Sequence, residues 1–171
     1  MTLKKQKILI TGGAGFIASN ITDLYIEEGH EVVIVDNLST GAKTNIPKKA
    51  KFYQEDICNL EKLDAIFKEE RPSLVNHHAA QIDVRTSISN PQKDAQINII
   101  GAINLLELAR KYEVSKLIYA GTGGALYGEL KNDVVEKLCG GDLGVSRRRF
   151  LPYRDQKQKS LSDKRARRVD P

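Results

Sequence analysis

The chain has 171 residues, with 27 Lys or Arg, 22 Asp or Glu, 13 Gly, two Cys and no Trp. This length is typical of one domain that buries its own hydrophobic core without disulfides or metal. Cys58 and Cys139 have no C-x-x-C partner, which indicates free thiols and a cytoplasmic protein. No apolar run approaches the ~20 residues of a membrane span, so we expect neither a membrane segment nor a signal peptide.

The positive charge is confined to one end of the chain. Residues 131–171 hold 12 basic and 6 acidic side chains, whereas residues 1–130 have a net charge of −1. A basic protein often binds nucleic acid, but here the body of the chain is near neutral. The basic run at 146–149 also lacks interleaved aromatic residues, so no nucleic-acid partner is predicted.

Strand and helix patterns alternate through the first 130 residues. Continuous apolar runs predict strands buried on both faces. Apolar residues at helical spacing fill the intervals between these runs, and Gly29 closes the first helix. The expected strands are 7–11, 31–35, 51–54, 73–76 and 116–120, and the expected helices are 16–28, 60–71 and 91–112. This order predicts an α/β fold, a doubly wound, Rossmann-like parallel sheet of about five strands.

Residues 131–171 have a different composition. Only 12 of these 41 residues are apolar, and they follow neither helical nor strand spacing. Such a segment buries too little surface to offset the entropy of ordering it. We therefore expect two parts, an α/β domain over 1–130 and a poorly packed or disordered basic tail over 131–171.

A glycine-rich turn lies between the first expected strand and helix. Gly12, Gly15 and Ala18 follow a G-x-x-G-x-x-A spacing, which allows a tight turn, close approach of a pyrophosphate, and close packing of helix on strand. Asp36 ends the second expected strand, where a carboxylate accepts both ribose hydroxyls of NAD and repels the 2′-phosphate of NADP. Turns attract glycine in any case, but the strand-turn-helix context favours a dinucleotide site that prefers NAD.

Six segments of the chain form a recognisable series, and they are TGGAGFIAS (11–19), VDNLSTG (35–41), EDI (55–57), HHAAQIDVRTS (77–87), NIIGAINLLE (98–107) and YAGTGGALYGE (119–129). In their content and order they resemble the extended short-chain dehydrogenases, and most closely their UDP-glucose 4-epimerase group of NAD-dependent sugar-nucleotide epimerases and dehydratases. They cover nearly all of residues 1–130. The resemblance implies the family's fold, its NAD cofactor and its chemistry on UDP-sugars.

The resemblance also assigns cofactor-binding residues. The pyrophosphate would be bound by Gly12, Gly15, Phe16 and Ile17, the ribose by Asp36 and Asn37, the adenine by Asp56 and Ile57, and the nicotinamide side by Ala79, Ala80, Gln81 and Asn98. Some have simpler explanations, since Ile57 also fits a core position and Asn98 a backbone contact. The adjacent His77 and His78 would point to opposite faces of a strand, so no metal site is expected.

For catalysis the family uses a hydroxyl, a Tyr and a Lys. Thr122 matches the hydroxyl position, and Tyr153 and Lys157 match the Tyr-x-x-x-Lys pair. A Tyr with an ordinary pKa near ~10 is a poor base, so the pair needs a nearby cation. Tyr153 lies 31 residues after Thr122, later than in the family, and the face that continues through Ser160 and Lys164 lacks an apolar stripe.

The implied activity is NAD-dependent 4-epimerisation of a UDP-sugar, the interconversion of UDP-glucose and UDP-galactose. A 4,6-dehydratase is an alternative, but Gly123 and Gly124 occupy the place of its usual Asp-Glu pair. The resemblance ends near residue 130, without the family's C-terminal sugar-binding subdomain, which suggests a truncated product with a frameshifted tail. A catalytically inactive NAD-binding fragment is the other alternative. Family members form homodimers through the helix at 91–112, and we expect aggregation or low stability if its partner helix is missing.

Overall fold

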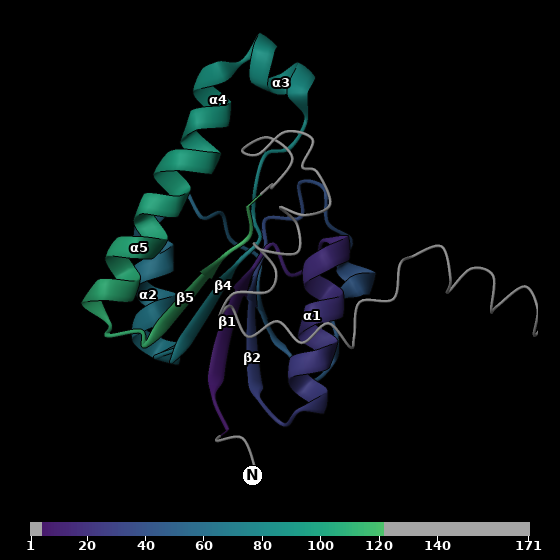
Figure 1. Cartoon of the computed structure of the whole chain (residues 1–171), viewed down its shortest axis with the longest axis vertical. Coiled ribbons are helices and arrows are strands. Elements are labelled where there is room, and N and C mark those ends of the chain that lie inside the picture. The colour runs from purple at the N-terminus through teal and green to yellow at the C-terminus, as the bar shows by residue number, and fades with distance from the viewer. Residues whose placement is uncertain (1–4, 122–171) are drawn as a thin grey trace, which may run out of the picture. The chain divides into compact units, whose positions relative to one another are not determined.

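The computed structural model describes residues 5–121, which contain one parallel five-stranded sheet (Figure 1). The strands lie in the order β3-β2-β1-β4-β5, and every neighbouring pair is parallel. Their bounds are β1 (Lys7–Thr11), β2 (Glu31–Val35), β3 (Lys51–Tyr53), β4 (Leu74–His77) and β5 (Lys116–Tyr119). The predicted Rossmann-like sheet is confirmed. Its strand order reverses between β1 and β4, where ligands bind at the carboxyl ends of such sheets.

Helices cover both faces of this sheet. Helix α1 (Phe16–Glu27) lies on one face, and α2 (Leu60–Glu70) and α5 (Gly101–Lys111) lie on the other (Figure 1). Local sequence sets their ends: Gly29 adopts a φ of 86° after α1, and the Asn59 side chain accepts a hydrogen bond from the Lys62 N–H at the start of α2. The short helix η1 (Lys43–Asn45) precedes β3.

The core consists of one apolar layer on each face of the sheet. Leu9 of β1 and Val75 of β4 pack with Leu63, Phe67 and Leu105 under α2 and α5. Residues of β1, β2 and β4 that point to the other face pack with Ala18 under α1, and they are Ile8, Ile10, Val32, Ile34 and Leu74. Successive strand residues point to opposite faces, so the continuous apolar runs supply both layers.

The helix predicted over 91–112 is interrupted. A short arm, α3 (Val84–Ser89) and α4 (Pro91–Ala95), extends beyond the carboxyl edge of the sheet (Figure 1). A π-helical turn, η2 (Gln96–Ile100), then joins α4 to α5. Asn98 at the centre of this turn contacts Gln81, and Gly101 at its end packs on Ile57, where a Cβ would lie 2.6 Å from Ile57 Cδ1. Such π-turns are rare and often lie at functional sites.

None of the helices within residues 5–121 combines the length and the hydropathy needed to cross a membrane. The expected boundary near residue 130 and the expected tail over 131–171 lie outside the described residues.

Candidate dinucleotide site

The glycine turn lies directly after β1 and faces the loop that follows β4. Gly12 has a φ of 70° and donates its N–H to the carbonyl of Val35 at 2.9 Å. A Cβ on Gly12 would lie 2.7 Å from the backbone nitrogen of Ala79, so only glycine fits this approach. Phe16 and Ile17 open α1 with largely exposed side chains. The first turn of a helix presents unpaired N–H groups, and here they lie at a surface where a phosphate can reach them.

Asp36 joins the end of β2 to the glycine turn. Its carboxylate accepts the Ala14 N–H at 2.9 Å through Oδ2 and the Leu38 N–H at 2.7 Å through Oδ1. The residue is only 8% exposed. An ionised carboxylate has about four acceptor positions, so each oxygen retains capacity for one more donor, such as a ribose hydroxyl.

Asn37, the residue after Asp36, forms a hydrogen bond with Asp56. The Asn37 side-chain amide donates to Asp56 Oδ2 at 2.8 Å, and Oδ1 of the same carboxyl accepts the Cys58 N–H at 2.8 Å. Partial burial alone would raise the pKa of Asp56, but the hydrogen bonds from Cys58 and Asn37 outweigh it and hold this pKa below its usual value. Asp56 is therefore an anion held by Asn37, the residue that follows Asp36.

Ile57 lies in the core rather than at the surface. Its side chain is 4% exposed and packs on Gly101, and its carbonyl accepts the Asn104 side-chain amide at 3.0 Å. These contacts agree with the simpler explanation that Ile57 is apolar because it occupies a core position. A role at the adenine ring remains a prediction.

The carboxyl end of β4 carries two histidines with different surroundings. His77 is buried, and its Nδ1 lies 2.6 Å from Thr11 Oγ1 at the end of β1. Burial, assisted by His78, lowers the pKa of His77 to about 4, and burial also lowers the pKa of His78. Both are therefore neutral at pH 7. Within residues 5–121, no three His, Cys, Asp or Glu side chains converge in a group that could hold a metal.

The loop after β4 contains Ala79, Ala80 and Gln81. Ala79 donates its N–H to Thr11 Oγ1 at 3.3 Å, which holds the loop beside Gly12. The Asn98 side chain bonds to the backbone of Gln81. The structure thus brings the residues expected at the pyrophosphate, ribose and nicotinamide to one edge of the sheet. Thr122, Tyr153 and Lys157 lie outside the described residues.

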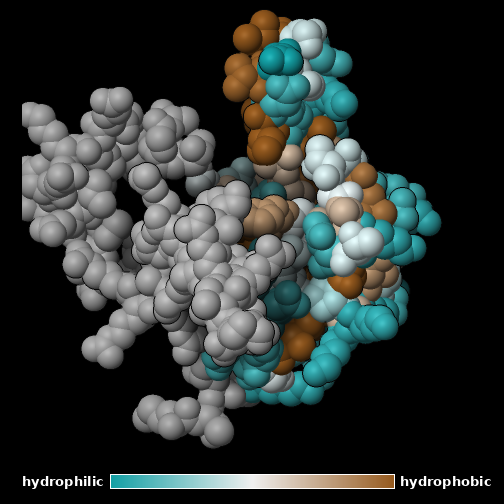
Figure 2. Space-filling model, turned by 90° about the vertical axis from the view of Figure 1, so that its right-hand side faces the viewer, coloured by the Kyte–Doolittle hydropathy of each residue, from teal (hydrophilic) through white to brown (hydrophobic). Residues whose placement is uncertain are grey.

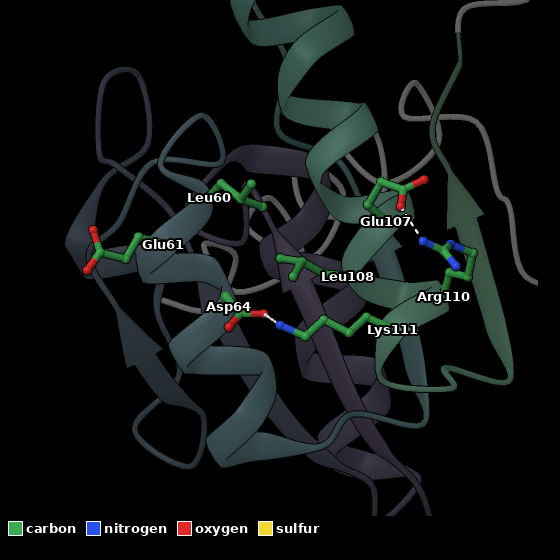
Figure 3. Close-up of a pocket in the computed structure, with 7 residues that line it drawn as sticks. All are labelled: Leu60, Glu61, Asp64, Glu107, Leu108, Arg110 and Lys111. Carbon is green, nitrogen blue, oxygen red and sulfur yellow. Dashed lines mark hydrogen bonds and ion pairs between the residues drawn. The ribbon is translucent and has the colours of Figure 1, made fainter.

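A groove of about 650 Å³ lies elsewhere, between α2 and α5 (Figure 3). Leu60 and Leu108 line it, and Asp64 pairs with Lys111 at 2.5 Å and Glu107 with Arg110 at 2.7 Å. None of the residues of the glycine turn, nor Asp36, lines this groove. Four of its five charged side chains thus form two ion pairs, and Glu61 is the fifth. Such pairs are typical of a helix–helix surface.

Comparisons with known proteins agree with this geometry. The model of the NAD dependent epimerase/dehydratase family matches residues 8–157. A putative UDP-glucose 4-epimerase of Methanocaldococcus jannaschii is 50% identical over 122 residues, which are 71% of this chain and 40% of the relative. The chain therefore spans about two fifths of the length of this relative.

Two solved structures are also similar. The UDP-glucose 4-epimerase of Thermotoga maritima with UDP-glucose is 48% identical, with a TM-score of 0.70 over 73% of this chain and 40% of that one. The Thermus thermophilus UDP-glucose 4-epimerase complex with NAD is 44% identical, with a TM-score of 0.70 over 74% of this chain and 40% of that one. The sequence, the fold and the site geometry together place the chain in the NAD dependent epimerase/dehydratase family.

Proposed function

We propose that this chain binds NAD at the carboxyl edge of its sheet and that the bound NAD serves the 4-epimerisation of a UDP-sugar. The observation that carries the proposal is the bond from the Ala14 N–H to the Asp36 carboxylate, which joins the phosphate-binding turn to the ribose-binding acid. The bare backbone at Gly12 supports it, since a Cβ there would collide with Ala79. Relatives described as UDP-glucose 4-epimerases support the reaction class.

Each part of the site has a distinct task in this proposal. The N–H groups at the start of α1 bind the pyrophosphate, and Asp36 binds the ribose and disfavours a 2′-phosphate. Bound there, NAD would supply the redox chemistry that a change of configuration at C4 of the sugar needs. Thr122 would orient the reacting hydroxyl, and Tyr153 with Lys157 would move its proton.

We also propose that the chain pairs with a second copy through the exposed side of η2 and α5. Ile99, Ile103 and Leu106 follow one another at spacings of four and three and are 57%, 47% and 51% exposed. An amphipathic helix with a second, exposed apolar stripe favours a partner on that side. The helix at 91–112 is the one that the family resemblance assigns to the homodimer.

Isothermal titration with NAD and NADP tests the cofactor, and Asp36→Ala provides the matched variant. We expect NAD to bind more tightly than NADP, and Asp36→Ala to weaken NAD binding at least tenfold because both the ribose acceptor and the link to Ala14 are lost. Equal affinity for the two cofactors, or none for NAD, contradicts the proposal.

Turnover of UDP-galactose tests the reaction. Formation of UDP-glucose supports 4-epimerisation, and a 4-keto-6-deoxy product identifies the dehydratase alternative. NAD binding without turnover indicates an NAD-binding chain that lacks the activity.

A further inference from the structure

The loop after β4 is connected to the protruding arm by a compact set of hydrogen bonds. The loop residue is Gln81. The arm contributes Ser87 of α3 and Asp94 of α4, and the adjoining turn η2 contributes Asn98. These four side chains are all partly buried. We refer to Gln81, Ser87, Asp94 and Asn98 as the loop clamp.

Asn98 binds both backbone groups of a single residue. Its Oδ1 accepts the Gln81 N–H at 2.8 Å, and its Nδ2 donates to the Gln81 carbonyl at 2.9 Å. A side-chain amide that pairs with one residue in this way fixes both its position and its orientation. The π-turn carries this amide, since Asn98 is its central residue.

Asp94 is the common acceptor of the clamp. Its Oδ1 accepts from Ser87 Oγ at 2.7 Å, from Gln81 Nε2 at 2.9 Å and from Asn98 Nδ2 at 3.3 Å. Hydrogen bonds to an ionised acceptor are stronger than neutral ones. The Gln81 side chain closes the network, because its Oε1 accepts the Asp83 N–H at 2.6 Å.

The amides of Gln81 and Asn98 are thus engaged by the chain itself. The loop they hold is the one that approaches Gly12, and its other end is fixed by the bond from the Ala79 N–H to Thr11 Oγ1. Two anchors, one on the sheet and one on the arm, therefore set how far this loop stands from the glycine turn.

We propose that Asn98 and Asp94 are positioning residues for the dinucleotide, which act by holding Gln81 and with it the loop 79–81 at a fixed distance from Gly12. Their side chains act through the backbone of Gln81 rather than through contact with the cofactor. This inference rests on the proposed NAD site. It assigns a task to Asp94 and to the π-turn, neither of which the sequence pattern singled out.

The substitution Asn98→Asp tests the clamp at constant size. An ionised carboxylate there keeps the acceptor for the Gln81 N–H, loses the donor to the Gln81 carbonyl, and faces Asp94. Repulsion from Asp94 and from the Gln81 carbonyl should displace this carboxylate and loosen its bond to the Gln81 N–H. We therefore expect NAD affinity at pH 7.5 to fall about tenfold, and exchange of the Gln81 amide hydrogen to accelerate even without NAD.

A pH comparison separates this role from a general loss of stability. A protonated carboxyl again offers one donor and one acceptor, so the NAD affinity of Asn98→Asp should recover at pH 5.5. Asp94 of α4 adjoins the introduced carboxyl, since Asp94 Oδ1 lies 3.3 Å from Asn98 Nδ2, and repulsion from Asp94 raises the pKa of the introduced group. The matched control is Asn90→Asp, which adds the same charge at the start of α4 and keeps the cap on the Lys93 N–H.

Recovery of Asn98→Asp at pH 5.5, with wild type and Asn90→Asp unchanged between the two pH values, supports the proposal. The proposal is overturned if Asn98→Asp binds NAD as tightly as the wild type at pH 7.5. It is also overturned if Asn98→Asp loses the same NAD affinity at both pH values while it still melts cooperatively. If the wild type binds no NAD, the proposed function fails instead. The exchange rate of the Gln81 amide then still reports whether Asn98 holds the loop.

Discussion

Thr11 links the ends of β1 and β4 through its side-chain hydroxyl. Its Oγ1 lies 2.6 Å from His77 Nδ1 and accepts the Ala79 N–H at 3.3 Å. A neutral His77 ring shares this hydrogen bond with the hydroxyl in either tautomer, and the Thr11 oxygen also accepts from Ala79. Thr11→Val keeps the shape but removes both interactions, so we expect NAD affinity to fall about threefold to tenfold, as titration calorimetry would measure.

Thr22→Val is a closely matched control for that substitution. Thr22 is 0% exposed, as Thr11 is, and its hydroxyl donates to the Ala18 carbonyl within α1 at 2.9 Å. Both variants lose a buried hydroxyl and about 1 kcal/mol or more of stability. Only Thr11→Val should lose affinity for NAD, and an equal loss in both variants would show that the hydroxyl of Thr11 has no positional role.

Single residues also show where sequence reasoning reaches its limit at the site. Asp36 was predictable, because an acid after the second strand of this fold lies next to the glycine turn, and its bond to Ala14 confirms that position. The pairing of Gln81 with Asn98 could not be predicted. It depends on how the loop after β4 packs on a helical turn 17 residues later in the sequence. Periodicity reports which face of a helix is apolar, but it does not identify the partner of a polar side chain.

At the scale of elements, the strands were easier to predict than the arm. Continuous apolar runs mark the central strands, and residues 7–11 and 31–35 match β1 and β2 in full. The region 84–100 was harder, since Val84, Ile88 and Ile99 are exposed, and their apolar character does not mark a core. The π-turn left no signal in the spacing, because one added residue per turn falls within the tolerance of a helical pattern.

The exposed face of α5 gives a testable expectation for this element. Ala102, Leu105 and Leu108 are buried against the sheet side, whereas Ile103 lies on the outer stripe at 47% exposure. Hydrophobic residues are also visible on the protruding arm in Figure 2. We expect self-association of the wild type in sedimentation velocity, and a shift towards the monomer in Ile103→Glu, because a charge there opposes burial of the stripe.

Leu24→Glu is the control for this effect. Leu24 has a similar exposure, 51%, but belongs to α1 on the other face of the sheet. The substitution Leu24→Glu should therefore leave the sedimentation coefficient unchanged. A wild type that remains monomeric at high concentration would contradict pairing through α5 and equally the expected aggregation.

At the scale of the whole molecule, buried ionisable groups determine how stability depends on pH. His77 is 3% exposed, and burial together with His78 lowers its pKa to about 4, whereas an unfolded chain has a His pKa near ~6.5. Between these values the unfolded chain binds a proton that the folded chain excludes. The free energy of unfolding therefore decreases as the pH falls below ~6.5, and His77 continues to contribute until about pH 4.

Carboxylates act in a lower pH window. Glu70 is buried, and although burial raises its pKa, hydrogen bonds from Lys51, Tyr53 and Lys7 outweigh this and keep the pKa low; the pKa of Asp56 is also lowered. These two carboxylates stabilise the folded protein fully above their pKa in the unfolded chain, which is ~4. This stabilisation is lost as the pH falls through their lower pKa values in the folded protein. The interval between pH 6.5 and 4 consequently reports on the histidines, with His78 acting in the same direction as His77.

Urea denaturation at pH 7.5, 6.0 and 5.0 measures this dependence. His77 alone should reduce the free energy of unfolding by about 2 kcal/mol between pH 7.5 and 5.0. His77→Asn removes the titrating ring, so it should be less stable at pH 7.5 but lose less stability on acidification. Parallel pH profiles for wild type and His77→Asn would show that His77 takes up its proton equally in the folded and the unfolded protein, and would contradict the lowered pKa that burial gives it.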